Sequence, residues 1–133
     1  MKVMVLGKAT AQSEAGEFGG PDEFVAMDQY NEKLAEAGIV LVAGDGLQPS
    51  SKGKRVTFDA DGNATVIDGP FTETKELVAG YSIWEVTSME EAVEWAKRSP
   101  FRDGQVELRK ILDASDFDPS LGDEIAAAAE RAG

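Results

Sequence analysis

Reactive and turn-forming side chains are concentrated in one run of the chain, residues 68–76. Asp68 and Glu73 are carboxylates that could exchange a proton, and Lys75 could stabilise an anion. A carboxylate serves as a base near neutral pH only when burial beside apolar groups raises its pKa. The Asp-Gly-Pro sequence at the start of the run favours a tight turn, and Phe71 would then plug the core. The run is therefore either a rigid turn or one wall of a ligand pocket.

Further candidates for the wall of a pocket lie elsewhere in the chain. Glu107 and Arg109 are two residues apart in an expected strand, so they share a face and either line a cavity or form an exposed ion pair. Tyr30, Tyr81 and Trp84 belong more often to a core or an interface than to a ligand platform. The pocket candidates are Asp68, Phe71, Glu73, Lys75, Tyr30, Tyr81, Glu107 and Arg109.

The residue types that are missing narrow the chemistry. The chain has no Cys and no His, which excludes disulfides, thiolate catalysis, Cys-based zinc sites and the usual general base. Residues 59–63 begin like a calcium loop, but Ala64 and Pro70 stand where such a loop needs Gly and Glu. Residues 44–46 lack the third glycine and the helix of a dinucleotide fingerprint. We therefore expect no metal and no cofactor.

Length and charge suggest one acidic domain. The chain has 133 residues and a formal net charge of −12, which disfavours nucleic acid and anionic membranes as partners. No apolar run approaches the length of a spanning helix, and the first apolar run is too short for a secretory signal, so we expect a cytoplasmic protein. We expect a domain at 1–112, followed by an acidic C-terminal extension at 113–133 with a helix at 121–132.

Hydrophobic periodicity predicts the elements that position these residues. Strands are expected at 2–8, 39–43, 55–59, 64–67, 81–86 and 106–112, and a mobile loop at 9–20. One helix should lie between Pro21 and Gly38, with Phe24, Met27 and Leu34 on its apolar stripe and Tyr30 at the edge. A second helix should begin at a Ser88 cap and end before Pro100.

The order is strand, helix, strand, hairpin, strand, helix, strand. Two β-α-β halves predict an α+β, ferredoxin-like fold with both helices on one face of an antiparallel sheet. The opposite face would expose Tyr81, Ile83 and Ile111, more apolar surface than a small monomer leaves open. We therefore expect a homodimer, in which two sheets meet as a dimeric α/β barrel with a pocket inside.

The chain resembles a known family from Met1 to about Leu112. It is similar to the DGPF group of YCII-related proteins in Asp68-Gly69-Pro70-Phe71, Glu73, Lys75, Glu76, Gly80-Tyr81, Ala92, Trp95-Ala96, Pro100 and Glu107-Leu108-Arg109. The resemblance implies a ferredoxin-like fold, a dimeric barrel and, for most members, no established activity. One branch of the family removes chloride from chlorinated hydroxyhydroquinones, and genes of the DGPF group often stand beside those of extracytoplasmic-function sigma factors.

The sequence departs from the catalytic relatives at two positions. Some of those relatives are thought to use a His and Asp pair, where this chain has Met27 and Ser99 before Pro100. A thioether cannot accept and return a proton at neutral pH, so the resemblance implies a pocket without this mechanism.

Three functions are therefore weighed. The leading one is a homodimeric domain that binds a small organic molecule or regulates without catalysis. The alternative is an enzyme acting on a small aromatic or carbonyl compound, with Asp68, Glu73 or Glu107 as base and Arg109 or Lys75 stabilising an anion. The third is a partner of an extracytoplasmic-function sigma factor.

Overall fold

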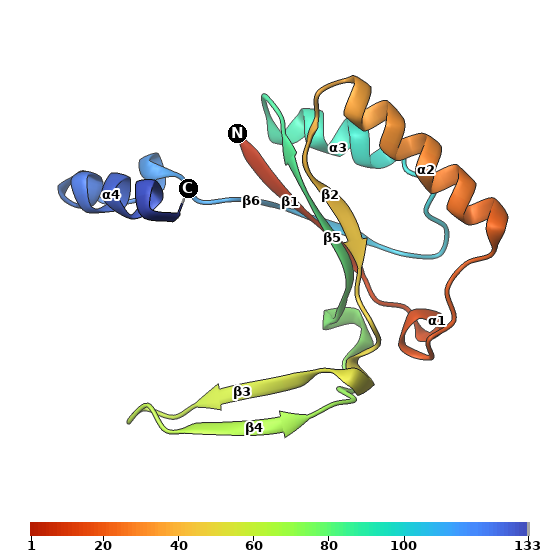
Figure 1. Cartoon of the computed structure of the whole chain (residues 1–133), viewed down its shortest axis with the longest axis horizontal. Coiled ribbons are helices and arrows are strands. Elements are labelled where there is room, and N and C mark those ends of the chain that lie inside the picture. Colours follow the sequence, from red (N-terminus) through yellow and green to blue (C-terminus); the bar gives the residue numbers. More distant parts are fainter. Residues whose placement is uncertain (133) are drawn as a thin grey trace.

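The chain folds as an α+β protein in which helices and an antiparallel sheet form two layers (Figure 1). The computed structural model describes residues 1–132, apart from the side chain of Lys75. The helices and strands, in chain order, are β1 (Lys2–Lys8), α1 (Ala11–Glu14), α2 (Pro21–Glu36), β2 (Val40–Gly46), β3 (Lys54–Phe58), β4 (Ala64–Asp68), β5 (Val78–Glu85), α3 (Met89–Lys97), β6 (Val106–Lys110) and α4 (Gly122–Ala132).

The main sheet has the strand order β2-β5-β1-β6, and every neighbouring pair is antiparallel. Val3 pairs with Trp84, and these side chains point toward α2 and α3, which lie on one face of the sheet (Figure 1). They form the core together with Leu34 of α2 and Ala92 of α3, all of them almost fully buried. Because both long helices cover the same face, the core is a single layer between helices and sheet.

The ends of the two long helices follow local chemistry. Pro21 opens α2, and Gly38 adopts a φ of +71°, a conformation that favours glycine, just beyond its end. Ser88 caps α3, because its Oγ accepts a hydrogen bond of 3.1 Å from the N–H of Glu91. The carboxylate of Glu91 accepts in turn from the N–H of Thr87 at 2.9 Å. These contacts confirm the predicted helix boundaries.

The hairpin β3-β4 forms a second, two-stranded sheet that projects from the body of the protein (Figure 1). Its turn is closed by Asp59, whose carboxylate accepts from the N–H groups of Asp61 and Asn63 at 2.9 Å each. Those hydrogen bonds, led by the ones from Asn63, hold the pKa of Asp59 below its ordinary value. Gly62 supplies a φ of +86° at the tip. The predicted hairpin is confirmed.

Several predicted details are wrong at the level of single elements. Residues 9–20, predicted as a loop, contain the short helix α1, because Thr10 and Ser13 cap its start reciprocally. Strand β2 continues to Gly46, since pairing with β5 extends it beyond Ala43. Phe24, predicted on the apolar stripe, is exposed, whereas Tyr30, predicted at its edge, is buried.

The other face of the main sheet carries half-buried apolar side chains. Leu6 pairs with Tyr81 and Met4 with Ile83, so these four point away from the helices. Within the described residues neither sheet closes into a barrel. None of the helices in residues 1–132 is both long and apolar enough to cross a membrane.

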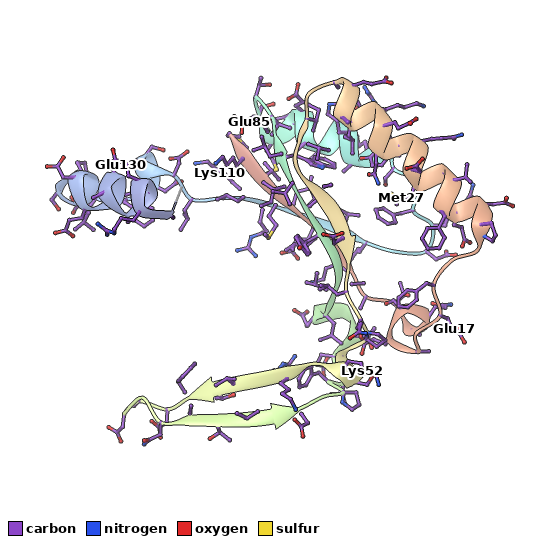
Figure 2. All side chains as sticks on the ribbon, in the orientation of Figure 1. Glu17, Met27, Lys52, Glu85, Lys110 and Glu130 are labelled. Carbon is purple, nitrogen blue, oxygen red and sulfur yellow. The ribbon has the colours of Figure 1, made fainter. Side chains whose placement is uncertain are left out.

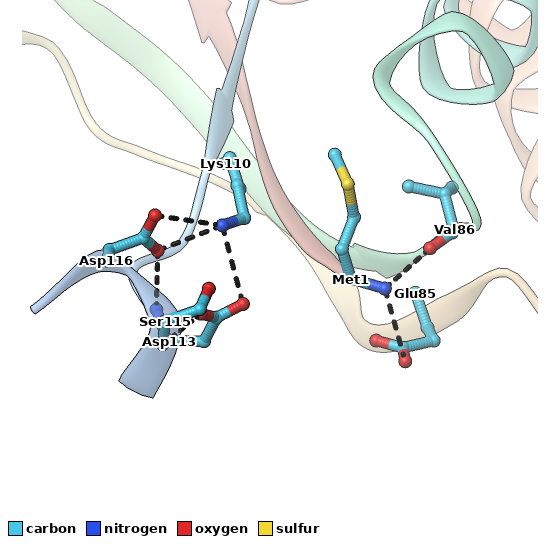
Figure 3. Close-up of polar contacts among 7 residues, drawn as sticks. All are labelled: Met1, Glu85, Val86, Lys110, Asp113, Ser115 and Asp116. Atoms are coloured by element: carbon cyan, nitrogen blue, oxygen red, sulfur yellow. Dashed lines mark hydrogen bonds and ion pairs between the residues drawn. The ribbon is translucent and has the colours of Figure 1, made fainter. Parts of the chain in front are cut away.

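Two polar clusters hold the chain next to its ends (Figure 3). The amino group of Met1 donates to the carbonyl of Val86 at 2.6 Å and lies 3.6 Å from the carboxylate of Glu85. Beyond β6, Lys110 Nζ lies 2.9 Å from Asp116 and 3.4 Å from Asp113. The second cluster fixes the direction in which the chain leaves the sheet toward α4.

Candidate ligand-binding cavity

A cavity of about 390 Å³ lies between the main sheet and the helices. Its walls come from β1, α1, α2, β2, β5, the end of α3 and residues 99–106. Large apolar side chains dominate it: Val5, Met27, Leu34, Trp84, Phe101 and Val106. The charged residues along it are Lys8, Asp45 and Arg102, of which the last two are exposed. A concave, mainly apolar site with few polar groups is typical of a small-molecule pocket.

Tyr30 brings a buried phenol to this cavity. Its hydroxyl donates a hydrogen bond of 2.7 Å to the carbonyl of Trp95, which lies near the C-terminal end of α3. Burial raises the pKa of Tyr30 to about 12, an effect that the charge of Arg98 partly opposes. At neutral pH Tyr30 is therefore a neutral phenol with its proton already engaged, and its oxygen can still accept a hydrogen bond from a ligand.

Trp84 presents an unsatisfied donor beside the same cavity. Its side chain is only 2% exposed, and its Nε1–H has no hydrogen-bond partner in the described part of the chain. Leaving a buried donor unpaired costs about 1–3 kcal/mol. A ligand atom or a water that accepts from Nε1 would recover that energy, because Trp84 lines the cavity.

The turn at Asp68–Phe71 lies away from this cavity, at the root of the hairpin. The N–H of Gly69 donates to the carbonyl of Gly53 at 3.0 Å, and the N–H of Phe71 donates to Ser50 Oγ at 3.1 Å. Ser50 in turn bonds the carboxylate of Glu14 through its N–H, at 3.0 Å, and through its hydroxyl. The turn therefore ties the hairpin to α1.

Phe71 does not plug the core, contrary to the prediction. It lines a second, more open hollow of about 420 Å³ at the hairpin root. The guanidinium of Arg55 lies 3.8 Å from the centre of its ring, a cation–π contact. Phe71 is half-buried because the hairpin carries it away from the layer between sheet and helices.

The remaining charged candidates are solvated. Asp68 pairs with Lys54 Nζ at 2.6 Å with both side chains largely exposed, and Glu73 is exposed just before the short helical turn Thr74–Glu76. Glu107 and Arg109 form an ion pair of 3.2 Å on the face of the sheet opposite the helices. The side chain of Lys75 lies outside the described residues.

The sequence of residues 1–115 matches the family described as YCII-related domain. The chain belongs to the YCII-related family. Comparison with curated proteins found no match. Among solved structures, the YCII-related chain is similar to a 5-chloro-2-hydroxyhydroquinone dehydrochlorinase from Burkholderia phenoliruptrix AC1100, determined in complex with 2,5-dihydroxybenzoquinone. The two are 19% identical with a TM-score of 0.47, over 89% of this chain and 100% of that chain.

In this YCII-related domain both positions that the resemblance singled out line the cavity. Met27 lies on the side of α2 that faces the sheet (Figure 2), and Ser99 follows the end of α3. A thioether and a hydroxyl stand there in place of an imidazole and a carboxylate. At neutral pH neither group exchanges a proton as a base, so these two positions supply an apolar wall and one hydrogen-bonding group.

The structure thus separates the predicted site residues of the YCII-related domain into those near the cavity, one at the hairpin root, and those in neither place. Tyr30 and Tyr81 are among the residues that line the cavity, although strand pairing directs the side chain of Tyr81 to the open face of the sheet. Phe71 lines the hollow at the hairpin root, and Asp68, Glu73, Glu107 and Arg109 line neither. The sequence places Trp84 in a core or an interface rather than in a ligand site. An indole in an otherwise apolar strand is the signal that could have indicated a buried donor there. No group of three or more acidic side chains in the described residues could hold a metal ion.

Proposed function

We propose that this YCII-related domain binds a small, mainly apolar molecule in the cavity between its sheet and its helices. The observation that carries the proposal is the unpaired Nε1–H of Trp84 beside a mainly apolar cavity of about 390 Å³. A ligand with one hydrogen-bond acceptor would satisfy this donor while its apolar body contacts Met27 and Phe101. No general base is required for binding, which agrees with the thioether at residue 27.

The proposal includes a ferredoxin-like fold and a homodimer. The strand order β2-β5-β1-β6 with both long helices on one face supports the ferredoxin-like arrangement. The half-buried apolar residues on the open face, among them Tyr81 and Ile83, support the pairing of two copies through their sheets. Such a dimer would form the α/β barrel expected from the sequence, and its C-terminal extension would lie outside the family domain.

The binding proposal is tested by thermal unfolding in the presence of small apolar compounds that carry one carbonyl or hydroxyl oxygen. A compound present at 100 times its dissociation constant stabilises the protein by about 2.7 kcal/mol. Trp84→Phe removes the donor and should weaken binding, whereas Trp95→Phe, a matched change outside the cavity, should not. The proposal fails if no compound in a broad panel raises the melting temperature, or if binding is indifferent to Trp84→Phe.

The enzyme alternative is favoured by one observation. Among the described residues that line the cavity, Asp45 is the one with a carboxylate side chain. Asp68, Glu73 and Glu107, the bases expected from the sequence, lie outside the cavity. Asp45 pairs with Tyr81 at the end of β2, so in this alternative a substrate would have to extend from the cavity past the edge strand β2 to reach its carboxylate. Conversion of a small aromatic or carbonyl compound that is lost in Asp45→Asn, with binding retained, would establish this alternative.

A sigma factor partner stays a prediction that follows from the family resemblance. It is tested by pull-down of an extracytoplasmic-function sigma factor encoded beside the gene, and a sigma factor that is not retained would remove this hypothesis.

A further inference from the structure

Two segments of the chain extend away from the body of the protein without a partner. The hairpin arm comprises residues 54–68, and the C-terminal arm comprises residues 111–132. Both extend from the sheet on the side away from α2 and α3, and they lie well apart from each other (Figure 1). The open face of the main sheet lies between them.

One face of the hairpin arm is apolar and uncovered. Val56 pairs with Val66 and Phe58 with Ala64, so these four side chains share a face, whereas Thr57 and Thr65 lie on the other. Val56, Phe58 and Val66 are 51%, 67% and 61% exposed. A two-stranded hairpin is marginally stable by itself and gains independent stability when another layer covers its apolar face. The hairpin arm therefore lacks that layer within its own chain.

The C-terminal arm offers a complementary apolar set. Leu112, Phe117 and Leu121 are 67%, 39% and 42% exposed. The arm leaves β6 in a fixed direction, because Lys110 is bound by Asp113 and Asp116 (Figure 3). Helix α4 packs mainly on the short turns Ala114–Asp116 and Pro119–Leu121 that precede it. The arm is thus held at its root while its apolar side chains stay accessible.

In a symmetric dimer the C-terminal arm could pack either on the C-terminal arm of the other copy or on its hairpin arm. The charges of the arms favour the second arrangement. Residues 113–132 carry six carboxylates and one arginine, so packing two C-terminal arms against each other would bring like charges together. Residues 52–68 carry three basic and three acidic residues, and the basic ones, Lys52, Lys54 and Arg55, are clustered at the root. The acidic C-terminal arm is therefore compatible with the hairpin arm of the other copy and not with the C-terminal arm of the other copy.

We propose that in the homodimer the C-terminal arm of each copy packs on the apolar hairpin face of the other copy. The inference rests on the homodimer proposed above. The contact is reciprocal, as a twofold interface requires, because each copy contributes one hairpin arm and one C-terminal arm. Val56, Phe58 and Val66 of one copy meet Leu112, Phe117 and Leu121 of the other, and the acidic start of α4 lies toward the partner's basic root.

Single-cysteine variants test this pairing directly, because the native chain has no Cys. Val66→Cys reports on the hairpin face and Ser120→Cys on the C-terminal arm. We mix the two full-length variants, let the subunits exchange, and add a short bismaleimide cross-linker. The expected product is a covalent heterodimer joined through residues 66 and 120, identified by mass spectrometry and several-fold more abundant than either homodimer.

The matched control is Glu36→Cys at the exposed end of α2, which should not cross-link to Val66→Cys. Efficient cross-linking of Val66→Cys alone would show that the hairpins pair with each other and would overturn the inference while leaving the homodimer intact. A monomeric protein would remove both the homodimer and the inference. Ligand binding, measured separately by thermal unfolding, would not be affected by that result.

A second measurement uses the dimer dissociation constant from sedimentation equilibrium. Phe58→Asp should raise it at least tenfold, because it places a charge in the apolar contact opposite an acidic arm. Thr57→Asp, on the opposite face of the hairpin, should change it less than threefold. Both side chains are exposed in the monomer, so circular dichroism should show the fold retained. Equal dissociation constants for the two variants would contradict the proposed contact.

Discussion

A Cβ atom added to Gly69 would lie 1.8 Å from the carbonyl oxygen of Ser50. Real Cβ atoms do not approach a backbone oxygen so closely, so residue 69 has to be glycine unless the backbone moves. The close approach exists because the N–H of Gly69 donates to the carbonyl of Gly53 and the N–H of Phe71 donates to Ser50 Oγ. The DGPF turn is therefore a structural junction between the hairpin and the body of the protein.

Gly69→Ala should lower the free energy of unfolding by about 1–3 kcal/mol, the usual cost of overpacking a closely packed site. Chemical denaturation monitored by circular dichroism measures the change. The matched control is Gly122→Ala, because Gly122 adopts helical angles and a Cβ there would meet nothing within 4 Å. Equal free energies of unfolding for the two variants would mean that the backbone at the hairpin root shifts to accept the added Cβ, and that the junction is not rigid.

Ser88→Ala should destabilise the protein by about 1 kcal/mol, because the side chain of Ser88 caps α3 through the N–H of Glu91. The loss should appear as a lower denaturation midpoint with an unchanged dependence on denaturant. Ser51→Ala is the control, since Ser51 is exposed and caps no helix among the described residues. A change below about 0.3 kcal/mol at Ser88 would contradict the capping role.

Tyr30→Phe should cost about 1–2 kcal/mol, because the carbonyl of Trp95 loses its buried donor. Tyr81→Phe is the control, because its hydroxyl makes no side-chain hydrogen bond within the described residues. The loss should be measured at pH 7 by denaturant unfolding. Similar losses in both variants would show that the hydrogen bond to Trp95 contributes little.

The pKa of Tyr30 gives a dependence on alkaline pH. The folded pKa of about 12 exceeds the ordinary value of 10.0, so the folded state resists deprotonation. This contribution to stability is fully present below pH 10 and is lost as the pH rises toward about 12. Absorbance titration of tyrosinate should show a component near pH 12 in the native protein that is missing in Tyr30→Phe. A native protein without that component would contradict the burial of this phenol.

Acid should release the root of the C-terminal arm. The N–H of Asp113, and then Lys110, lower the pKa of Asp116 below its ordinary 3.8, while the hydroxyl and N–H of Ser115 lower that of Asp113. A lowered carboxyl pKa stabilises the folded turn above pH 3.8, and the effect is lost as the pH falls through the folded values. The protection of the Ser115 amide against hydrogen exchange, relative to the intrinsic rate at each pH, should fall in that range. Asp116→Asn should make the protection of the Ser115 amide less dependent on pH.

The order of elements and several local contacts could be predicted from the sequence alone. The periodicity of Val3 and Val5, the helix cap at Ser88 and the Asp59–Asn63 turn each depend on residues a few positions apart, so local chemistry was sufficient. The α+β class followed from the order of these elements. The family followed from the DGPF run and the residues around it.

Only the tertiary structure decided which residues share a site. Trp84, Met27 and Ser99 line one cavity because antiparallel pairing and the packing of α2 and α3 bring three distant segments together. Ser50 reaches Glu14 across 36 residues for the same reason. Such contacts depend on how strands pair and where helices cross, which no local pattern encodes, and this moved the candidate site from the DGPF turn to the cavity.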